Sequence, residues 1–392
     1  MDFTLSKEHE VLQSRKTDLK EQGSIAGAEN SVGKRVLVIN PGSTSTKLAL
    51  FCGEKKEFDT TIRHSREELK PYSWVMEQVD CRCTAIEREI TVHHVDLTSL
   101  DAVCARGGQL PYCAAGTYQI DQEMVDFMYT VRDAAHASNL GCVLALRLAQ
   151  PLKIPAFTCD PVTVDEMNDE ARVSGLPELP RMMTGHPLNC RAMAMRCAED
   201  VLHKPLTGCR LIVLHLGGGA SARLFIGGKM VDGVRDDEWM FSPERMGGVS
   251  LCPLVSMCFS GKYTKQEVMN LIRGKGGLVA HLGTASAQEV EQRIQKGDAH
   301  AKLVYDGMLY SCARAVGGLA AAAADGSVDR IILTGGLANS KYVADYLTKK
   351  LSFIAPVEIM AGEFEMEALA AGACRVLNGQ EKPLRFADIP KA

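Results

Sequence analysis

The sequence predicts an α/β protein made of two similar domains, each with a mixed sheet flanked by helices, and three observations lead to this prediction. The chain has 392 residues, which exceeds what one small hydrophobic core usually supports. Strand-like apolar segments alternate along it with segments of helical periodicity. A unit of strand, polar glycine-containing turn and returning strand begins at residue 35 and again at residue 211, roughly 175 residues later, as in a duplicated fold. We therefore expect about five strands in each sheet.

The first half of the chain should contain short strands and helices after its opening hairpin. Strands are predicted at residues 35–41, 48–51, 87–95, 102–106 and 154–159, and helices at residues 121–129 and 138–149. Residues 1–33 are polar and end in a run of small residues. We expect them to form a short helix and a flexible lead outside the core.

The second half repeats the opening unit and then continues with alternating elements. Strands are predicted at residues 211–216, 222–225, 329–334 and 357–360, and helices at residues 189–201, 302–324 and 365–376. The glycine-rich turn between the first two of these strands, at residues 217–221, matches in position the turn at residues 42–47. The sequence therefore predicts one ligand-facing turn in each half.

Composition and charge limit the classes of partner. The net charge is −4, with acidic and basic residues interspersed, so the chain has no basic stripe for nucleic acid. No apolar stretch reaches the ~20 residues that a membrane span needs. The N-terminal segment lacks the basic and then apolar pattern of a signal peptide. We therefore expect a cytoplasmic protein that binds neither nucleic acid nor membranes.

The fourteen cysteines are scattered along the chain. Several lie in apolar segments, namely Cys104, Cys142, Cys159, Cys209, Cys312 and Cys374. Such positions are typical of buried free thiols in a reducing compartment. Cys81 and Cys83 are too close together to form half of a zinc site, and no matching pair follows. We therefore expect no metal–thiolate site.

The turn at residues 42–47 is the first candidate for ligand binding. It follows Asn40 and combines a glycine with the hydroxyl groups of Ser43 and Ser45 and the ammonium group of Lys47. A glycine lets backbone approach a ligand closely, and hydroxyl and ammonium groups suit an anion such as phosphate. The turn is not a P-loop, because Thr46 stands where that motif needs glycine and a strand follows. A polar hairpin tip without a ligand is the alternative.

This hairpin resembles the phosphate-1 loop of the sugar kinase, Hsp70 and actin superfamily, and further short strings extend the resemblance. In order, the chain contains NPGSTSTK at residues 40–47, ARGG at 105–108, HASNLG at 136–141, DPVTVD at 160–165, HLGGGAS at 215–221, FSPER at 241–245, RGKGG at 273–277, TGG at 334–336 and EMEALA at 365–370. Each string alone is a weak signal. As an ordered set they make residues 35–377 resemble the butyrate kinases, which are close relatives of the acetate kinases.

The resemblance implies a fold and a domain organisation. The fold would consist of two duplicated actin-like (ribonuclease H-like) domains with mixed sheets flanked by helices, and the active site would lie in the cleft between them. The first domain would comprise residues 34–160 and 370–392, and the second, nucleotide-binding domain residues 161–369. The resemblance also implies a homodimer or a higher homo-oligomer, for which the apolar segment 251–258 could supply an interface.

The resemblance implies a reaction as well: reversible transfer of the γ-phosphoryl group of ATP to butyrate, giving butyryl phosphate and ADP, with Mg²⁺ as the metal ion. A carboxylate acceptor has a pKa of about 4–5 and is already ionised at neutral pH, so this chemistry needs no general base. Cations and hydrogen-bond donors around the transferred group are what it does need. A branched-chain fatty acid (isobutyrate) kinase, an acetate or propionate kinase, and a non-catalytic ATP-dependent switch remain alternatives. Chain-length preference, direction and oligomer size stay open.

Four residues are the catalytic candidates. Arg106 ends a predicted strand, just before a Gly-Gly turn, and could hold the acceptor carboxylate with its two-pronged guanidinium. By resemblance, Arg245 would stabilise the transition state and His186 would donate a hydrogen bond to the transferred phosphoryl group. The family usually has Phe and Ala where this chain has Gly185 and Pro187. The alternatives are a surface salt bridge for Arg106, a solvent-facing loop residue for Arg245, and a packing role for His186.

Asp160 is the fourth catalytic candidate and also a metal ligand, because carboxylates at strand ends often hold Mg²⁺. Glu365 is the second metal candidate by resemblance, with Glu363 and Glu367 near enough to take its place. His136, by contrast, is expected to cap or pack against the helix that follows it. The remaining candidates would bind nucleotide or phosphate: Asn40, Ser43, Ser45, Lys47, His215, Gly217, Gly218, Gly219, Gly335, Gly336 and Asn339.

Overall fold

The computed structural model describes residues 33–132, 136–323 and 327–390. The chain divides into two units, Met1–Gly33 and Lys34–Ala392, and the architecture below is that of the second. The helix and flexible lead that we expect at residues 1–33 fall, up to residue 32, outside the described residues.

The first sheet contains seven strands within the described part of the chain, in the order β12-β5-β6-β4-β1-β2-β3. Their bounds are β1 (Arg35–Pro41), β2 (Ser45–Cys52), β3 (Lys55–Arg63), β4 (Ala102–Ala105), β5 (Thr117–Gln119), β6 (Ala156–Cys159) and β12 (Leu384–Arg385). The sheet is mixed, because β1 pairs antiparallel with β2 and parallel with β4. It exceeds the expected size of about five strands, since the sequence patterns missed β3 and the very short β5 and β12.

The second sheet contains five strands in the described segments, in the order β11-β10-β7-β8-β9. Their bounds are β7 (Arg210–Leu216), β8 (Ala220–Ile226), β9 (Lys229–Val234), β10 (Arg330–Gly335) and β11 (Val357–Ala361). Here β7 pairs antiparallel with β8 and parallel with β10. The β7–β8 hairpin thus has the same pairing relationships as the β1–β2 hairpin, which is the duplication that the repeated turn predicts.

Helices cover both sheets. Their bounds are α2 (Arg66–Leu69), α3 (Val79–Val92), α4 (Gln122–Met128), α5 (Asn139–Leu152), α6 (Asp169–Arg172), α7 (Pro187–Arg196), α8 (Leu251–Cys258), α9 (Lys265–Ile272), α10 (Leu278–Leu282), α11 (Ala287–Gln295), α12 (Ala299–Ala322), α13 (Lys341–Leu351) and α14 (Glu365–Leu377). A π-helical turn, Cys197–Val201, extends α7. None of the described helices has both the length and the apolar character to cross a membrane.

The strand predicted at residues 87–95 is wrong, because these residues fall mostly within α3. The β-branched side chains that suggested a strand cluster at the end of the helix. The buried positions Val79, Cys83, Ile86 and Ile90 follow one another at intervals of three and four residues, which is the period of one helix face. Tertiary packing of that face therefore overrides the local strand propensity.

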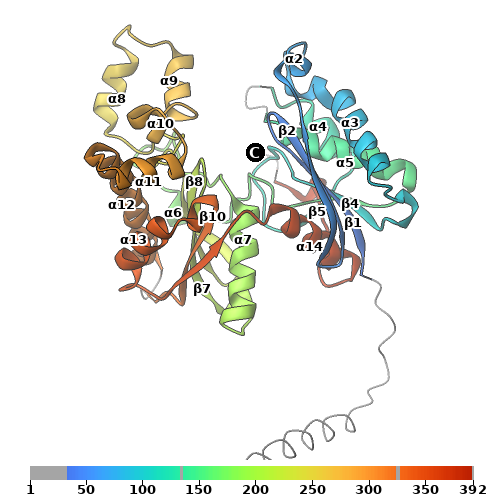
Figure 1. The fold of residues 1–392 in the computed structure, drawn as a ribbon. Helices are drawn as coiled ribbons and strands as arrows, with labels where there is room; N and C mark the ends of the chain where they lie inside the picture. The colour runs from blue at the N-terminus through green and yellow to red at the C-terminus, as the bar shows by residue number, and fades with distance from the viewer. Residues whose placement is uncertain (1–32, 133–135, 324–326, 391–392) are drawn as a thin grey trace, which may run out of the picture. The chain divides into compact units, whose positions relative to one another are not determined.

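Alternate residues of β1 serve two different cores. Leu37 and Ile39 belong to the cluster that includes residues of α3 and α5, whereas Val36 and Val38 pack with Leu369 and its neighbours in α14. Strand side chains point alternately to opposite faces, so one short strand is buried on both sides. Figure 1 shows α14, near the C-terminal end of the chain, beside β1 and β5 near its beginning. The chain therefore returns to its first sheet after completing the second.

Candidate active site

The turn between β1 and β2 is held from below by a buried arginine. The Gly42 N–H donates to the Ser45 carbonyl over 2.7 Å, which closes the turn and leaves Ser43 exposed at its tip. The Arg82 guanidinium lies underneath, fully buried, and burial lowers its pKa. It donates to the carbonyl oxygens of Gly42, Ser43 and Ser45 and to the Thr46 hydroxyl, over 2.9 to 3.1 Å.

This contact set orients the turn. Because its carbonyl oxygens are bound on the inner side, the Ser43 hydroxyl and the Lys47 ammonium group stay on the accessible side, where an anion could meet them. Sequence reasoning missed Arg82. The sequence did contain a signal for it, because Arg82 lies on the apolar face of a predictable helix period. A buried guanidinium needs hydrogen-bond acceptors around it.

Glu365 connects two of the predicted site residues. Its Oε2 atom accepts hydrogen bonds from Asn40 Nδ2 over 2.8 Å and from Arg106 Nη1 over 3.0 Å. The neighbouring acids have other partners: Glu363 lies 3.8 Å from the Nζ atom of Lys47, itself a predicted site residue, and Glu367 lies 3.5 Å from Lys56 Nζ. Of the three glutamates left open by the sequence, Glu365 is the one that contacts Arg106.

The backbone around Arg106 is fixed by a close approach between two elements. The Arg106 N–H continues the ladder by donating to the Ile39 carbonyl over 2.9 Å. Its own carbonyl packs so closely on Gly141, in the first turn of α5, that any Cβ there would collide with it. Gly141 is therefore needed for packing, and the HASNLG string contributes to the site by holding the segment that carries Arg106.

His186 and His215 are brought together by buried polar groups. Asn189, on α7, donates through Nδ2 to His215 Nδ1 over 3.0 Å and to the Thr334 hydroxyl over 3.1 Å, and its Oδ1 accepts from the Phe364 N–H over 3.1 Å. His186 Nδ1 lies 3.0 Å from the Ser221 hydroxyl. The side chain of Asn189, on α7, thus forms hydrogen bonds with residues of β7 and β10 and with the residue just before α14. Sequence reasoning missed it, because its partners are up to 175 residues away.

Both histidines have lowered pKa values. Burial lowers the pKa of His186 well below its usual value, and the charges of His215 and of Arg106, Arg223 and Arg245 lower it further. Burial also lowers the pKa of His215 to about 4, although the Glu365 carboxylate opposes this shift. Two neutral imidazoles therefore lie at the site at neutral pH, each able to donate one N–H.

The conformation before His186 explains a departure from the family pattern. Gly185 has φ of +135°, a region that side chains rarely adopt, and a Cβ there would lie 2.9 Å from Arg223 Nη2. Arg223 is fully buried and donates to the Thr184 carbonyl. A phenylalanine at position 185 would meet this guanidinium, so glycine is required here. Pro187 occupies the first turn of α7, where a missing N–H costs nothing.

Arg245 lies beside the turn between β7 and β8. Its Nε atom is 3.2 Å from Asp236 Oδ2, and burial raises the pKa of that carboxyl group while Arg245 opposes the rise. A Cβ on Gly219 would lie 3.7 Å from both Arg245 Nε and His186 Cε1. Arg245 and His186 therefore flank the same glycine. The loop of Arg245 is anchored there, since the Gly218 carbonyl accepts from the Ser242 hydroxyl and the Glu244 N–H.

Asp160 has a different set of partners. Its Oδ1 accepts from the Gly116 N–H over 2.8 Å, and its Oδ2 lies 3.8 Å from Arg191 Nε. Burial raises its pKa to about 6, although Arg191 and the Gly116 N–H oppose the rise. The residue has φ of +39°. His136 contacts Ser138, the residue before α5, through its Nδ1 atom, and burial together with the charges of Arg106 and Arg245 lowers its pKa.

The two carboxylates that the sequence offers for Mg²⁺ suit that ion chemically. Magnesium is held by oxygen atoms, usually one or two carboxylates with substrate phosphates and water. Asn40 and Arg106 both donate to Oε2 of Glu365, so in the described structure Oε1 is the oxygen that a ligand could engage. Asp160 is a buried carboxylate with a raised pKa, and a nearby cation would stabilise its ionised form.

The remaining glycine turn lies at the end of β10. Gly335 has φ of +89° and exchanges backbone hydrogen bonds with Gly362, of 3.0 and 3.1 Å. A short 3₁₀ turn, Gly336–Asn339, then leads into α13 through the cap residue Ser340. Asn339 is exposed, donates through Nδ2 to the Gly336 carbonyl, and lies just before the N-terminus of α13.

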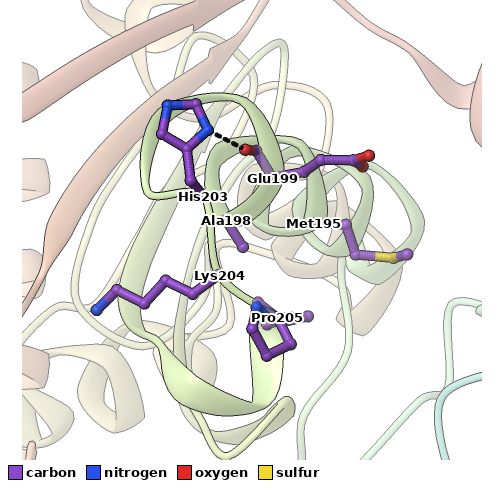
Figure 2. Close-up of a pocket in the computed structure, with 7 residues that line it drawn as sticks. Met195, Ala198, Glu199, His203, Lys204 and Pro205 are labelled. Atoms are coloured by element: carbon purple, nitrogen blue, oxygen red, sulfur yellow. Dashed lines mark hydrogen bonds between the residues drawn. The ribbon is translucent and has the colours of Figure 1, made fainter. Parts of the chain in front are cut away.

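Two surface hollows lie apart from these groups. One is lined by Arg66, Glu67, Leu69 and Lys70 on and beside α2. The other, shown in Figure 2, is lined by residues at the C-terminal end of α7 and the turn after it, among them Met195, His203 and Lys204. His203 points its ring at its own helix end, where Nδ1 contacts the Glu199 carbonyl. Neither hollow contains any of the candidate site residues.

Comparison with known proteins identifies relatives of this chain. The model of the acetokinase family matches residues 190–367. Butyrate kinase 2 of Clostridium acetobutylicum is 44% identical over 354 residues, which cover 90% of this chain and 99% of that protein. A probable butyrate kinase 2 of Caldanaerobacter subterraneus subsp. tengcongensis is 46% identical over 351 residues, covering 89% and 98%.

Solved structures show the same fold. The acetate kinase of Porphyromonas gingivalis superimposes with a TM-score of 0.72, at 18% identity, over 88% of this chain and 100% of its own. A propionate kinase of Francisella tularensis gives a TM-score of 0.69, at 16% identity, over 86% and 98%. The actin-like fold predicted from the sequence is thereby confirmed. With relatives above 40% identity over nearly their whole length, the chain belongs to the acetate and butyrate kinase family.

Proposed function

We propose that the protein is a butyrate kinase: it transfers the γ-phosphoryl group of ATP to butyrate, reversibly, by direct in-line transfer. One bond forms between phosphorus and a carboxylate oxygen while the bond to the β-phosphate oxygen breaks, and ADP leaves. The observation that most directly supports this function is geometric: a Cβ on Gly219 would lie 3.7 Å from both Arg245 Nε and His186 Cε1. A cation and a neutral hydrogen-bond donor then flank one glycine turn, as the meeting of two anions there requires.

In this proposal Arg106 holds the acceptor carboxylate. Glu365 engages Arg106 through Nη1, which leaves the rest of the guanidinium to form a fork with the substrate. His186 donates from Nε2 to the transferred phosphoryl group while its Nδ1 accepts from the Ser221 hydroxyl. Arg245 neutralises the charge that develops on the equatorial oxygens. No residue has to remove a proton, because the carboxylate arrives ionised.

The nucleotide is proposed to lie along the three glycine-containing turns. Lys47, Ser43, Ser45 and the N–H groups of residues 217–219 would bind the β- and γ-phosphates. Gly335, Gly336 and Asn339 would lie against the α-phosphate and the adenosine. Glu365 and Asp160 are the proposed ligands of Mg²⁺, directly or through water. When bound, the ion would neutralise phosphate charge and orient the γ-phosphoryl group.

Discrimination between acids of similar chain length rests on small differences in binding free energy. One methylene group changes binding in an apolar pocket by about 1–3 kcal/mol, so neighbouring chain lengths should be accepted with graded rates. The relatives named butyrate kinase support butyrate as the preferred acceptor. We further propose that the protein is cytoplasmic and acts as a homo-oligomer. The apolar face of α8 supports the second point, since Leu251 is 76% exposed and Val255 is 55% exposed.

A rate panel tests the proposal. Acetate, propionate, butyrate, isobutyrate and valerate are each supplied with ATP and Mg²⁺, and the acyl phosphate is trapped with hydroxylamine. We expect the highest kcat/KM with butyrate, and ATP synthesis from butyryl phosphate and ADP in the reverse assay. A preference for isobutyrate, acetate or propionate would select a sibling activity. Binding of ATP without acyl phosphate from any acid would favour the non-catalytic switch.

A further inference from the structure

Three potential metal ligands meet beneath the phosphate-binding turn, away from the residues proposed for catalysis. They are His64, directly after β3, Glu68 in α2, and Cys81 in α3. Their ligand atoms all lie within 4.8 Å of one another. Glu68 Oε1 is 3.1 Å from Cys81 Sγ and 3.5 Å from His64 Nδ1. The three residues come from successive elements, so the fold alone brings them together.

The imidazole of His64 supplies an independent sign of a ligand. The side chain is 1% exposed, and its Nε2 atom is engaged by the Thr46 hydroxyl at 3.0 Å. Its Nδ1 atom is buried, and in place of a hydrogen bond of normal geometry it has a long contact of 3.5 Å with Glu68 Oε1. This nitrogen faces the Glu68 carboxylate, whose Oε1 atom also contacts Cys81 Sγ. A buried nitrogen without a hydrogen bond is costly, and a metal ion at this point would use its lone pair.

The separations can be compared with those in a tetrahedral metal centre. With bonds of the usual length to Zn²⁺, nitrogen and oxygen ligands stand about 3.4 Å apart, and sulfur stands about 3.6 Å from either. The His64 Nδ1–Glu68 Oε1 separation of 3.5 Å agrees with this geometry, and the Glu68 Oε1–Cys81 Sγ separation of 3.1 Å is about 0.5 Å shorter. The His64 Nδ1 and Cys81 Sγ atoms lie within 4.8 Å of each other, so side-chain rotation has to adjust the two contacts of Cys81 for all three atoms to bind one ion.

The donor set also selects the ion. A thiolate, an imidazole and a carboxylate suit Zn²⁺ and similar borderline ions, whereas Mg²⁺ prefers oxygen alone. Glu68 can serve without losing its structural role. Its Oε2 caps the Ser65 N–H in a capping box, while Oε1 points to the other two ligands. Cys81 is half-buried, so an ion can reach the group from solvent and keep a water molecule as its fourth ligand.

We propose that His64, Glu68 and Cys81 form a binding site for a Zn²⁺-like ion, distinct from the Mg²⁺ that the kinase reaction would use. This proposal goes against the expectation of no metal–thiolate site, which considered the spacing of cysteines alone and not a histidine and a glutamate brought to Cys81 by the fold. On binding, the ion displaces the Cys81 thiol proton, which passes to solvent, and three protein ligands and a water complete its shell. The site touches the phosphate-binding turn, because the His64 ring contacts the Thr46 hydroxyl and the His64 backbone N–H donates to the Thr44 carbonyl. An occupied site would therefore stiffen that turn.

The test measures metal binding by the full-length, nucleotide-free protein. The parent for all variants carries Cys252→Ser and Cys258→Ser, because these two exposed thiols could bind zinc by themselves. Zinc is titrated against a chromophoric chelator, and Co²⁺ is used separately to detect thiolate ligation by its charge-transfer absorption. We expect one equivalent of bound zinc, a rise in Tm on binding, and a Co²⁺–thiolate band.

Matched variants assign the ligands. Cys81→Ser should remove the Co²⁺–thiolate band and weaken zinc binding by at least about tenfold. Glu68→Gln should weaken it too, while keeping a capping box that accepts glutamine. Glu67→Gln, one residue away on the same helix and exposed, is the control and should bind as the parent does. The proposal is overturned if the parent binds no zinc at micromolar concentration, or if Cys81→Ser binds it as tightly as the parent.

Discussion

The imidazole rings of His186 and His215 stack with their centroids 4.0 Å apart and their planes inclined by 13°. The tautomer of His215 follows from its surroundings. Asn189 must present Oδ1 to the Phe364 N–H, so its Nδ2 donates to His215 Nδ1. His215 therefore carries its proton on Nε2, the atom nearest the place where a Cβ of Gly217 would lie. This neutral donor points to the proposed phosphate-binding turn.

The stacked pair predicts a loss of stability in weak acid. The pKa of His215 is lowered to about 4 in the folded protein, so between about pH 6.5 and pH 4 the unfolded state binds more protons than the folded state. Its contribution to stability is complete above about pH 6.5 and falls as the pH drops towards 4. The burial of His186 acts with the same sign. Urea unfolding at pH 7.5, 6.5 and 5.5 should show a decreasing free energy of unfolding.

Two variants isolate this effect. His215→Gln should be less stable than the wild type at pH 7.5, but its free energy of unfolding should change less between pH 7.5 and 5.5. His203→Gln, at an exposed position, should keep the wild-type dependence. The interpretation fails if His215→Gln and the wild type lose stability in parallel over this range.

The buried Asp160 carboxylate affects the pH dependence of folding stability with the opposite sign. Its pKa is raised to about 6, so the cost of holding its charge in a buried place is complete above about pH 6 and disappears as the pH falls towards 4. Asp160→Asn removes that cost. Asparagine also suits the left-handed φ of +39° better than most residues and can still accept from the Gly116 N–H. At pH 8 the variant should be more stable than the wild type by on the order of 1–3 kcal/mol.

The same variant separates stability from the proposed metal role. If Asp160 helps to hold Mg²⁺, Asp160→Asn should lower kcat at least about tenfold and raise the Mg²⁺ concentration needed for half-maximal rate. The stability difference from the wild type should shrink as the pH approaches 4. Full activity at every Mg²⁺ concentration would remove Asp160 from the metal site and leave it a buried structural acid.

Arg106 is predicted to place the acceptor. Arg106→Ala should reduce kcat/KM for butyrate at least tenfold, because a buried charge-assisted pair is worth on the order of 1.5–3 kcal/mol. Arg106→Lys should recover little of this loss, since an ammonium group cannot form the fork. Steady-state rates with varied butyrate at saturating ATP measure the effect. Near wild-type activity of Arg106→Ala with butyrate would exclude the role.

The sequence predicted much of the fold, and named part of the candidate site, where the signal lay in neighbouring residues. The β1–β2 and β7–β8 hairpins could be predicted because an apolar strand, a glycine turn and a second strand follow one another directly. Glu365 could be proposed as a metal ligand only with Glu363 and Glu367 as alternatives, because Arg106, the partner that distinguishes it, is 259 residues away. Arg82 and Asn189 escaped notice for the same reason: a polar residue on a helix gains its meaning from the distant acceptors and donors that surround it.

Arg245 is predicted to act in the transition state more than in nucleotide binding. In-line transfer develops charge on the γ-phosphoryl oxygens while the carboxylate and ADP stand on opposite sides. In the structure, Arg245 Nε lies 3.2 Å from Asp236 Oδ2, and Arg245 flanks Gly219 together with His186. The guanidinium is therefore held close to the glycine turn at residues 217–219. Arg245→Ala should lower kcat by roughly 10²–10⁴-fold while KM for ATP changes little. Steady-state kinetics with varied ATP at saturating butyrate separate the two parameters.

A second variant tests whether Asp236 positions this arginine. Asp236→Asn keeps a hydrogen-bond acceptor but removes the charge, so kcat should fall less than in Arg245→Ala, with KM for ATP again little changed. Aluminium fluoride with ADP and butyrate, a planar mimic of the transferring group, should inhibit the wild type strongly and Arg245→Ala weakly. An Arg245→Ala enzyme that keeps its kcat but loses affinity for ATP would place the guanidinium on the ground-state nucleotide. Asp236 would then hold it for binding, and the stabilisation of the transferring group would have to come from Arg106 and His186.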